Sequence, residues 1–297
     1  MAEATKRYAV VTGANKGIGF AISKQLASNG ITVVVTARDE KRGLEAVANL
    51  KQLGLPGSIV FHQLDVTDPA SISSLADFIS NQFGKLDILV NNAGIRGSIL
   101  DHDALEASIA AGEEGVNIDW NKIATSTYES VTACIGANYY GTKGMCEALI
   151  PLLKLSDSPR IVNVTSTWGI LEILPNGWAK GVLSDVESLT EEKIDGVLSQ
   201  FLEDFKESLL ETKGWPTASP GYKVSKAASN AYTRILSKKY PSFCINAVCP
   251  GYVKTDLNSH TGYLTVDEGA ESVVRLALLP NGGPSGLFFS RSEVVPF

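Results

Sequence analysis

Residues 8–19 read YAVVTGANKGIG, an apolar β-branched run followed at once by a glycine-rich turn. The glycines are Gly13, Gly17 and Gly19, and a helical pattern begins at Gly17. Glycines in such a turn permit tight backbone geometry and close approach of a ligand. The free N–H groups at the start of the helix would then point at phosphate oxygens. The stretch predicts a pyrophosphate-binding loop between a strand and a helix, and a purely structural turn is the alternative.

Six further short runs rich in β-branched residues follow the first. They occupy residues 31–36, 58–64, 86–91, 160–165, 243–248 and 286–290. Most are continuously apolar, which is typical of strands buried on both faces of a parallel sheet, and amphipathic stretches of helical length separate them. This alternation predicts an α/β fold, a doubly wound, Rossmann-like parallel sheet of about seven strands in a single domain over residues 1–297. A ligand is expected beyond the carboxyl ends of the strands, where the strand order reverses.

Two stretches, near residues 95–125 and 167–220, break this alternation. Both follow strand ends that should face the ligand, so we expect two insertions that overhang the active-site crevice; ordinary surface insertions are the alternative. Within the second, residues 189–214 predict a helix with Thr190 as N-cap and Gly214 at its end. We expect its apolar stripe to cover the outer face of the domain, which would keep the protein monomeric; a dimer interface is the alternative. The stripe consists of Ile194, Val197, Leu198, Phe201, Leu202, Phe205 and Leu209.

Composition excludes several classes of protein. The chain has 297 residues, of which 44% are apolar and 20% charged, which argues against disorder, collagen and coiled coil. Its net charge of −6 gives no general attraction to nucleic acid or to anionic membranes. No apolar run approaches the roughly 18 residues of a membrane span. The four cysteines form no C-x-x-C pair and no apolar signal stretch opens the chain, so we expect a cytoplasmic protein with free thiols. The three histidines are scattered, and no metal site is expected.

The second apolar run bears on the choice of cofactor. It ends in VVVTARD, residues 33–39, where an acid would accept the hydroxyls of an adenine ribose. Small Ala37 is followed there by Arg38, and Lys16 lies in the glycine turn nearby. Two cations suit a 2′-phosphate, and arginine can bind phosphate with two hydrogen bonds, so the pair favours NADP(H). Asp39 is the competing candidate for the ribose, and we assign it to the N-cap of the next helix.

A candidate catalytic pair lies in GYKVSKAASNAY, residues 221–232. Tyr222 and Lys226 are four positions apart, so a helix would place them on one face. A nearby ammonium lowers the pKa of a phenol, which can then give a proton to an alkoxide and take it back. Ser166 follows the run 160–165, where its hydroxyl could hold a carbonyl oxygen, and Asn138 lies on a predicted helix before that run.

Together these motifs resemble the short-chain dehydrogenase/reductase family. TGANKGIG, HQLDVTD, NNAG, VNVTS, YKVSK and CPGYVKTD occur in the family's order and spacing along essentially the whole chain. The likeness is greatest to monomeric carbonyl reductases, and among them to the plant branch that includes salutaridine, menthone and isopiperitenone reductases. It implies NADPH-dependent reduction of a ketone or aldehyde on an apolar small molecule, a terpenoid, an alkaloid or another carbonyl compound, to the alcohol.

The resemblance also implies a role for each matching residue. Tyr222 would donate the proton, and Ser166 would anchor the carbonyl oxygen. Lys226 would bind the nicotinamide ribose and lower the pKa of Tyr222, and Asn138 would hold a water in the proton relay. The implied cofactor-binding residues are Gly13, Asn15, Lys16, Gly17, Ile18, Gly19, Arg38, Asp65, Val66, Asn92, Ala93, Gly94, Tyr222, Lys226, Pro250, Gly251, Val253 and Thr255.

Two other functions stay open. Isopiperitenone reductase reduces a C=C bond and carries Glu in place of the catalytic Tyr, so an enone reductase on the same scaffold is one alternative; Tyr222 favours C=O reduction. A catalytically silent NADP-binding regulatory protein is the other, and the complete catalytic set argues against it. We interpret Trp168, Trp178 and Trp215, in or beside the second insertion, as packing residues rather than as substrate-stacking ones.

Overall fold

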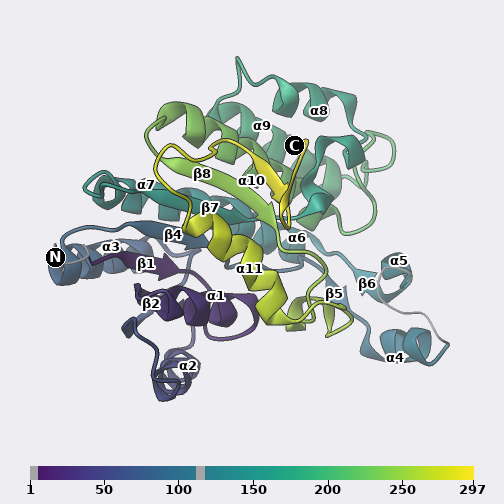
Figure 1. The fold of residues 1–297 in the computed structure, drawn as a ribbon. Coiled ribbons are helices and arrows are strands. Elements are labelled where there is room, and N and C mark those ends of the chain that lie inside the picture. Colours follow the sequence, from purple (N-terminus) through teal and green to yellow (C-terminus); the bar gives the residue numbers. More distant parts are fainter. Residues whose placement is uncertain (1–5, 112–117) are drawn as a thin grey trace.

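Eight strands form the main sheet of the computed structural model, which describes residues 6–111 and 118–297. Their order is β3-β2-β1-β4-β7-β8-β9-β10 (Figure 1). The strands are β1 (Tyr8–Val11), β2 (Thr32–Ala37), β3 (Ile59–Gln63), β4 (Ile88–Asn91), β7 (Arg160–Val164), β8 (Cys244–Cys249), β9 (Phe288–Ser290) and β10 (Glu293–Val295). The seven predicted runs are all strands, and the α/β fold is confirmed.

The eighth strand was not predicted. β10 pairs antiparallel with β9 at the edge of the sheet, whereas the other neighbours pair in parallel. It has three residues and returns from β9 through a tight turn in which Arg291 has a φ of 54°. β9 is equally short but has two buried phenylalanines, whereas Glu293 and Val294 of β10 are exposed, so β10 forms no apolar run that marks a strand.

The strand order reverses beside β1. This strand lies between β2 and β4, with Val10 aligned to Val34 on one side and to Leu89 on the other. Chain segments that leave the carboxyl ends of β1 and β4 therefore run to opposite faces of the sheet. The gap between them is where a ligand binds in folds of this kind.

Helices cover both faces of the sheet, each over its own apolar core. One core joins the sheet to α1 (Gly17–Ser28), α2 (Glu40–Gln52) and α11 (Val266–Ala277). The other joins it to α3 (Pro69–Phe83), α6 (Tyr128–Ile135), α7 (Gly141–Leu153) and α10 (Pro220–Lys239). Strands β2, β4 and β8 are buried over their whole length between these two cores, which explains their continuous apolar sequences.

The first insertion forms an arm beside the body. It holds β5 (Ile99–Leu100), α4 (His102–Ala110), α5 (Trp120–Ile123) and β6 (Ala124–Thr125), and β5 pairs antiparallel with β6. Figure 1 shows these elements projecting away from the sheet. They have a small apolar cluster of their own, centred on Leu105, Ile118 and Ile123. Residues 112–117, which fall in the predicted insertion, lie outside the described residues.

The second insertion packs against the body. It holds short 3-10 turns η3 (Thr167–Gly169) and η4 (Leu171–Ile173), followed by α8 (Gly177–Ser184) and α9 (Glu191–Lys206). α9 lies against α6, α8 and α10, and its apolar stripe belongs to the larger core. Thr190 caps it as predicted, with its hydroxyl accepting from the Lys193 N–H at 3.3 Å.

The predicted end of this helix is wrong. α9 stops at Lys206, and Ser208 takes a left-handed φ of 58°, so Leu209 lies beyond the helix. The chain turns early because Trp215 folds back onto α9. Its indole donates to the Asp204 carboxylate at 2.7 Å, and its ring lies 5.2 Å from that of Phe201.

The tryptophans divide between two environments. Trp215 is 2% exposed and is the packing residue we expected. For Trp168 and Trp178 that expectation is wrong, since they are 39% and 53% exposed. Trp168 lies in η3 and Trp178 in α8, and both are partly open at the surface of the second insertion.

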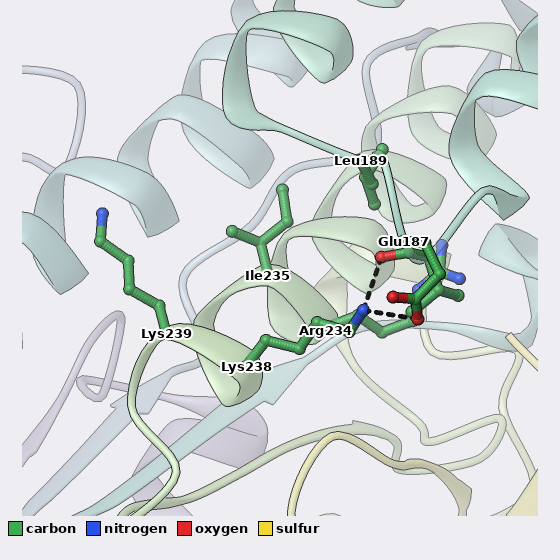
Figure 2. Close-up of a pocket in the computed structure, with 7 residues that line it drawn as sticks. Glu187, Leu189, Arg234, Ile235, Lys238 and Lys239 are labelled. Carbon is green, nitrogen blue, oxygen red and sulfur yellow. Dashed lines mark hydrogen bonds and ion pairs between the residues drawn. The ribbon is translucent and has the colours of Figure 1, made fainter.

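A shallow hollow between α10 and the second insertion lies apart from the strand ends. Its lining residues are Val186, Glu187, Leu189, Arg234, Ile235, Lys238 and Lys239 (Figure 2). Lys238 donates to the Val186 carbonyl at 2.8 Å and to Glu187 at 2.9 Å. These contacts hold the insertion to α10. Over the described ranges, no helix is long and apolar enough to cross a membrane.

Candidate active site

The glycine turn and the loop after β4 form the floor of the candidate site. Thr12 follows β1, and its Oγ1 accepts hydrogen bonds from the N–H groups of Asn92 and Ala93, each at 2.9 Å. The side-chain amide of Asn92 donates in return to the carbonyls of Thr12 and Gly13, at 2.9 and 3.1 Å. The two strand ends beside the reversal are therefore held together as one unit.

The glycines leave bare backbone on this floor. Gly13 and Gly17 have φ of 62° and 56°, in the left-handed region that glycine adopts without strain. A Cβ on Gly19 would lie 2.4 Å from the Gly13 carbonyl oxygen, so no side chain fits there. Asn15 and Ile18 lie in the same turn. This cradle, at the N-terminus of α1, fits a pyrophosphate.

Polar groups stand at the ends of β2 and β3. The Asp39 carboxylate accepts from the Arg42 N–H at 2.9 Å and caps α2, which confirms the N-cap assignment. Arg38 beside it is exposed. Asp65 accepts from the N–H and hydroxyl of Thr67 at 2.9 and 2.7 Å. Burial raises the pKa of Asp65, but these hydrogen bonds and the Arg38 charge outweigh it, and the pKa lies below its usual value.

Asn138 fastens the floor to α10. It lies in a π-helical turn, residues 136–140, between α6 and α7. Its Oδ1 accepts from the Ile95 N–H at 2.8 Å, and its Nδ2 donates to the Ser225 hydroxyl at 3.0 Å. Its backbone carbonyl accepts from two side-chain hydroxyls, of Thr142 and Ser229. The extra residue of a π turn often marks a functional position.

α10 and the end of β7 bring the predicted catalytic residues together. Lys226 Nζ lies 5.6 Å from the centroid of the Tyr222 ring and donates to the Val164 carbonyl at 3.0 Å. Ser166 follows β7 by two residues, and its hydroxyl accepts from the Trp168 N–H at 3.1 Å. The same hydroxyl interacts with that of Tyr222. The spacing of four positions therefore places Tyr222 and Lys226 on one face of α10, as the sequence predicted.

Burial changes the pKa of both members of the pair. Lys226 is 6% exposed, and burial lowers its pKa to about 8, so the ammonium prevails at neutral pH. Burial raises the pKa of Tyr222, while Ser166 and the charge of Arg96 lower it. The Arg96 guanidinium is a cation that the sequence did not indicate for this effect, and the lowering expected from Lys226 stays a prediction. The phenol stays protonated at neutral pH, which is the form that can donate a proton.

The segment after β8 roofs the cradle. Pro250 and Gly251 turn the chain away from the sheet, with a φ of 92° at the glycine. Val253 is 3% exposed because its side chain packs against Gly269 of α11, so only its backbone could face a cofactor. The Thr255 methyl lies 3.6 Å from where a Cβ on Gly17 would stand. Roof and floor thus enclose the start of α1.

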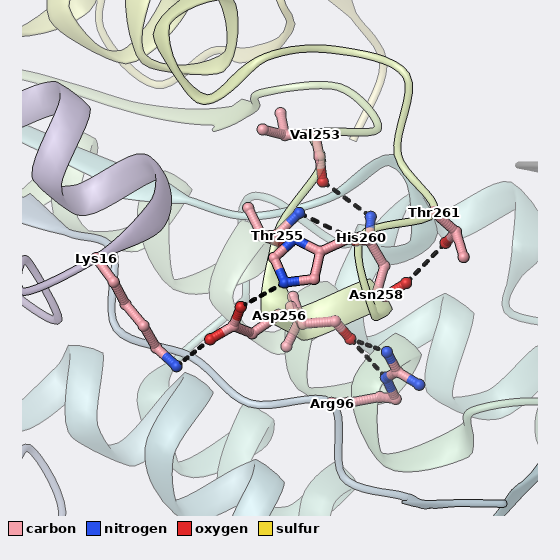
Figure 3. A network of polar contacts seen from close by, with 9 residues as sticks. Lys16, Arg96, Val253, Thr255, Asp256, Asn258, His260 and Thr261 are labelled. Atoms are coloured by element: carbon pink, nitrogen blue, oxygen red, sulfur yellow. Dashed lines mark hydrogen bonds and ion pairs between the residues drawn. The ribbon is translucent and has the colours of Figure 1, made fainter. Parts of the chain in front are cut away.

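Two side chains tie this roof to the floor, and the sequence did not predict either contact. Lys16 pairs with Asp256, and Arg96 Nε donates to the Leu257 carbonyl at 2.6 Å (Figure 3). The Arg96 guanidinium also lies 4.9 Å from the Trp120 ring. Arg96 lies outside the motifs of the sequence, and Asp256 ends the motif CPGYVKTD with nothing to indicate its partner, since each contact depends on where distant segments meet.

Trp168 stands at the open side of the site. Its ring meets that of Tyr222 edge to face, with centroids 6.1 Å apart, and Lys223 Nζ lies 5.3 Å from its centroid. The predicted residues therefore meet along one edge of the sheet, with an aromatic wall beside the phenol. Among the described residues, no group of three His, Cys, Asp or Glu side chains is placed to hold a metal ion.

A doubly wound sheet with a glycine cradle and a buried Tyr–Lys pair defines a dinucleotide-dependent oxidoreductase. Residues 7–177 match the family model of the short chain dehydrogenases. The chain is 62% identical to (+)-neomenthol dehydrogenase of Arabidopsis thaliana over the whole of both chains. It is 36% identical to carbonyl reductase [NADPH] 1 of Rattus norvegicus, covering 97% of this chain and 98% of that one.

The solved structure of salutaridine reductase from Papaver somniferum superposes with a TM-score of 0.92. That match has 52% identity and covers 96% of this chain and 99% of the other. The chain therefore belongs to the short-chain dehydrogenase family. It is an oxidoreductase that acts on the carbonyl–alcohol pair, and its family uses a nicotinamide cofactor.

Proposed function

We propose that the protein is an NADPH-dependent reductase that converts a ketone or aldehyde on an apolar small molecule, a terpenoid or an alkaloid of plant secondary metabolism, to the alcohol. The observation that carries this proposal is the meeting of Ser166, Tyr222 and Lys226 beside the glycine cradle. Relatives named for neomenthol and for salutaridine support the substrate class.

The residues would divide the reaction as follows. Ser166 and Tyr222 hold the carbonyl oxygen with their hydroxyls, and Tyr222 gives its proton to that oxygen as the alcohol forms. The nicotinamide cofactor supplies the hydride. Lys226, charged at neutral pH, stabilises the phenolate that remains and binds the nicotinamide ribose. Asn138 keeps the loop after β4 and α10 in register and would hold the water of the proton relay.

Three residues support a preference for NADPH over NADH as the cofactor. Asp39 is occupied as the N-cap of α2, so it is not free to accept the ribose hydroxyls. Arg38 and Lys16 are exposed cations at the end of β2 and in the glycine turn. Charge-assisted hydrogen bonds from both to a 2′-phosphate would be worth about 1.5–3 kcal/mol each.

The insertions would shape the substrate side of the site. Trp168 offers an apolar face beside Tyr222, and β5, the first element of the arm, begins five residues after Gly94. We also propose that the enzyme works as a monomer in the cytoplasm. The stripe of α9 is buried within its own chain, and the four cysteines are free and buried.

Replacing Tyr222 by Phe tests the assignment. The ring stays and the proton is removed, so kcat for ketone reduction should fall by about 10²–10⁴-fold. Affinity for NADPH, measured by fluorescence titration, should barely change. The assay follows NADPH absorbance with menthone, a simple aldehyde and an enone, and identifies each product. A variant that keeps more than about a tenth of the wild-type rate would show that Tyr222 is not the acid.

A further inference from the structure

Asp256 bridges the roof and the floor of the site from an unexpected position. One of its carboxylate oxygens meets Lys16 Nζ, and the other lies 2.9 Å from His260 Nε2 (Figure 3). The Lys16 hydrogen bond is the main cause that lowers the pKa of Asp256, so the carboxylate is charged at neutral pH. Lys16 is the cation that the proposed function assigns to the 2′-phosphate.

The position of Asp256 is set by its own segment rather than by Lys16. The Asn258 amide donates to the Val253 carbonyl at 2.9 Å and accepts from the Thr255 N–H at 3.2 Å. Ser259 and His260 both take a left-handed φ, of 52° and 62°, which turns the imidazole back over the carboxylate. Asp256 would therefore keep its place, and its contact with His260, if Lys16 swung away.

Lys16 is free to make that movement. The side chains of Lys16 and Asp256 are 59% and 54% exposed, and exposed ion pairs contribute little stability. A phosphate monoester carries more charge than a carboxylate and offers three acceptor oxygens. The phosphate would draw the Lys16 ammonium away from Asp256. The Asp256 carboxylate, left without its partner, would then repel the phosphate.

We propose that Asp256 competes with the cofactor's 2′-phosphate for Lys16, and so acts as a positioning residue that weakens the capture of NADPH and eases the release of NADP⁺. The inference rests on the proposed role of Lys16. Binding of the phosphate moves Lys16 from the carboxylate to the cofactor, and release moves it back. The same exchange breaks the contact between Lys16 and Asp256, which joins the floor to the roof. The contact of Arg96 with the Leu257 carbonyl, which also joins them, is kept.

The experiment measures dissociation constants for NADPH and NADH by fluorescence titration, with no substrate present. Asp256→Asn keeps the shape of the side chain and removes its charge. It should tighten NADPH binding by about threefold to fivefold, the range of an exposed ion pair, and leave NADH unchanged. Asp256→Glu retains the charge and is the matched control, with wild-type constants expected. Asp256→Ser is the second replacement should the Asn variant unfold.

Lys16→Ala separates this inference from the proposed function. It should weaken NADPH binding alone, and in its background Asp256→Asn should no longer tighten binding. If Lys16→Ala leaves the NADPH constant unchanged, Lys16 is no phosphate ligand, and the proposed cofactor site fails at that point. If Lys16→Ala weakens NADPH but Asp256→Asn weakens it too, changes nothing or moves NADH equally, Asp256 does not compete for Lys16 and the inference is overturned.

Discussion

The two insertions follow the carboxyl ends of β4 and β7, yet they are built in opposite ways. The second lays α9 on α6 and α10, and its Phe201 is fully buried in the larger core of the domain. The first has a core of its own, in which Leu105, Ile118 and Ile123 meet one another rather than the sheet. One insertion is part of the folded body, and the other is an arm attached to it.

Within residues 95–111 and 118–125, the contacts that attach the arm to the body gather at its root. A Cβ on Gly97 would lie 2.5 Å from that of Cys134, and the Ser130 hydroxyl donates to the Gly97 carbonyl at 3.1 Å. Arg96 adds its contact with the Leu257 carbonyl. Beyond the root, Ile99 and Ile109 are 60% and 45% exposed. We therefore expect α9 to open together with the body, and the arm to open alone at a smaller cost in free energy.

The largest effect should come from Phe201→Asp. The side chain is 0% exposed and lies 5.2 Å from the Trp215 ring, so the variant leaves a cavity and buries a charge. We expect a loss of at least about 4 kcal/mol in the free energy of unfolding, measured in urea. Light scattering should show self-association once the face under α9 is exposed, whereas the proposed monomer of the wild type would have the chain mass of 31.6 kDa.

The matched control is Leu105→Asp, which puts the same charge at a position that is 4% exposed in the arm. It should unfold the arm and leave the urea midpoint of the body near its wild-type value. Equal losses from the two substitutions would contradict the comparison, because they would show that both insertions share one cooperative core.

A smaller effect is expected from Trp215→Phe. The ring packing on Phe201 is kept, but the Asp204 carboxylate, 5% exposed, loses the indole donor at 2.7 Å. Gln200 remains as a partner at 3.1 Å. An under-satisfied buried carboxylate costs about 1–3 kcal/mol, and the urea midpoint should fall accordingly. Asp204→Asn in the same background should recover part of the loss, and a wild-type midpoint in Trp215→Phe would show that the end of α9 does not depend on this hydrogen bond.

The sequence predicted those parts of the fold that depend on interactions between residues close together in the chain. The apolar runs marked the seven strands that pair in parallel, the glycine turn marked the cradle, and the spacing of Tyr222 and Lys226 put both on one face of α10. Asp39 and Thr190 were assigned as N-caps because capping acts over three residues.

Contacts between distant segments could not be predicted in this way. Lys16 and Asp256 are 240 positions apart, and Arg96 and Leu257 are 161 apart. The end of α9 depends on the hydrogen bond of Trp215 to Asp204, which lie on either side of a turn. The exposure of Trp168 depends on how the second insertion packs on the body. The same holds for the pKa of Tyr222, because burial and the distant Arg96 act on it and no local pattern indicated either effect.

The smallest effect on the body should come from Leu105→Ala, which also probes what the arm does. Among the nine described residues of α4, Leu105 is the buried one, so its loss removes the main apolar contact of that helix. The free energy of unfolding of the body should change by less than about 0.5 kcal/mol, as for a surface substitution. Hydrogen exchange of the α4 amides should become faster, while that of α9 stays as in the wild type. Because the arm is proposed to overhang the crevice, KM for menthone should rise, with kcat and the NADPH dissociation constant unchanged. Glu106→Ala, one position along on the exposed side of α4, is the control and should alter none of these quantities. If Leu105→Ala speeds exchange in α4 but leaves KM unchanged, the arm moves independently and does not contact the substrate.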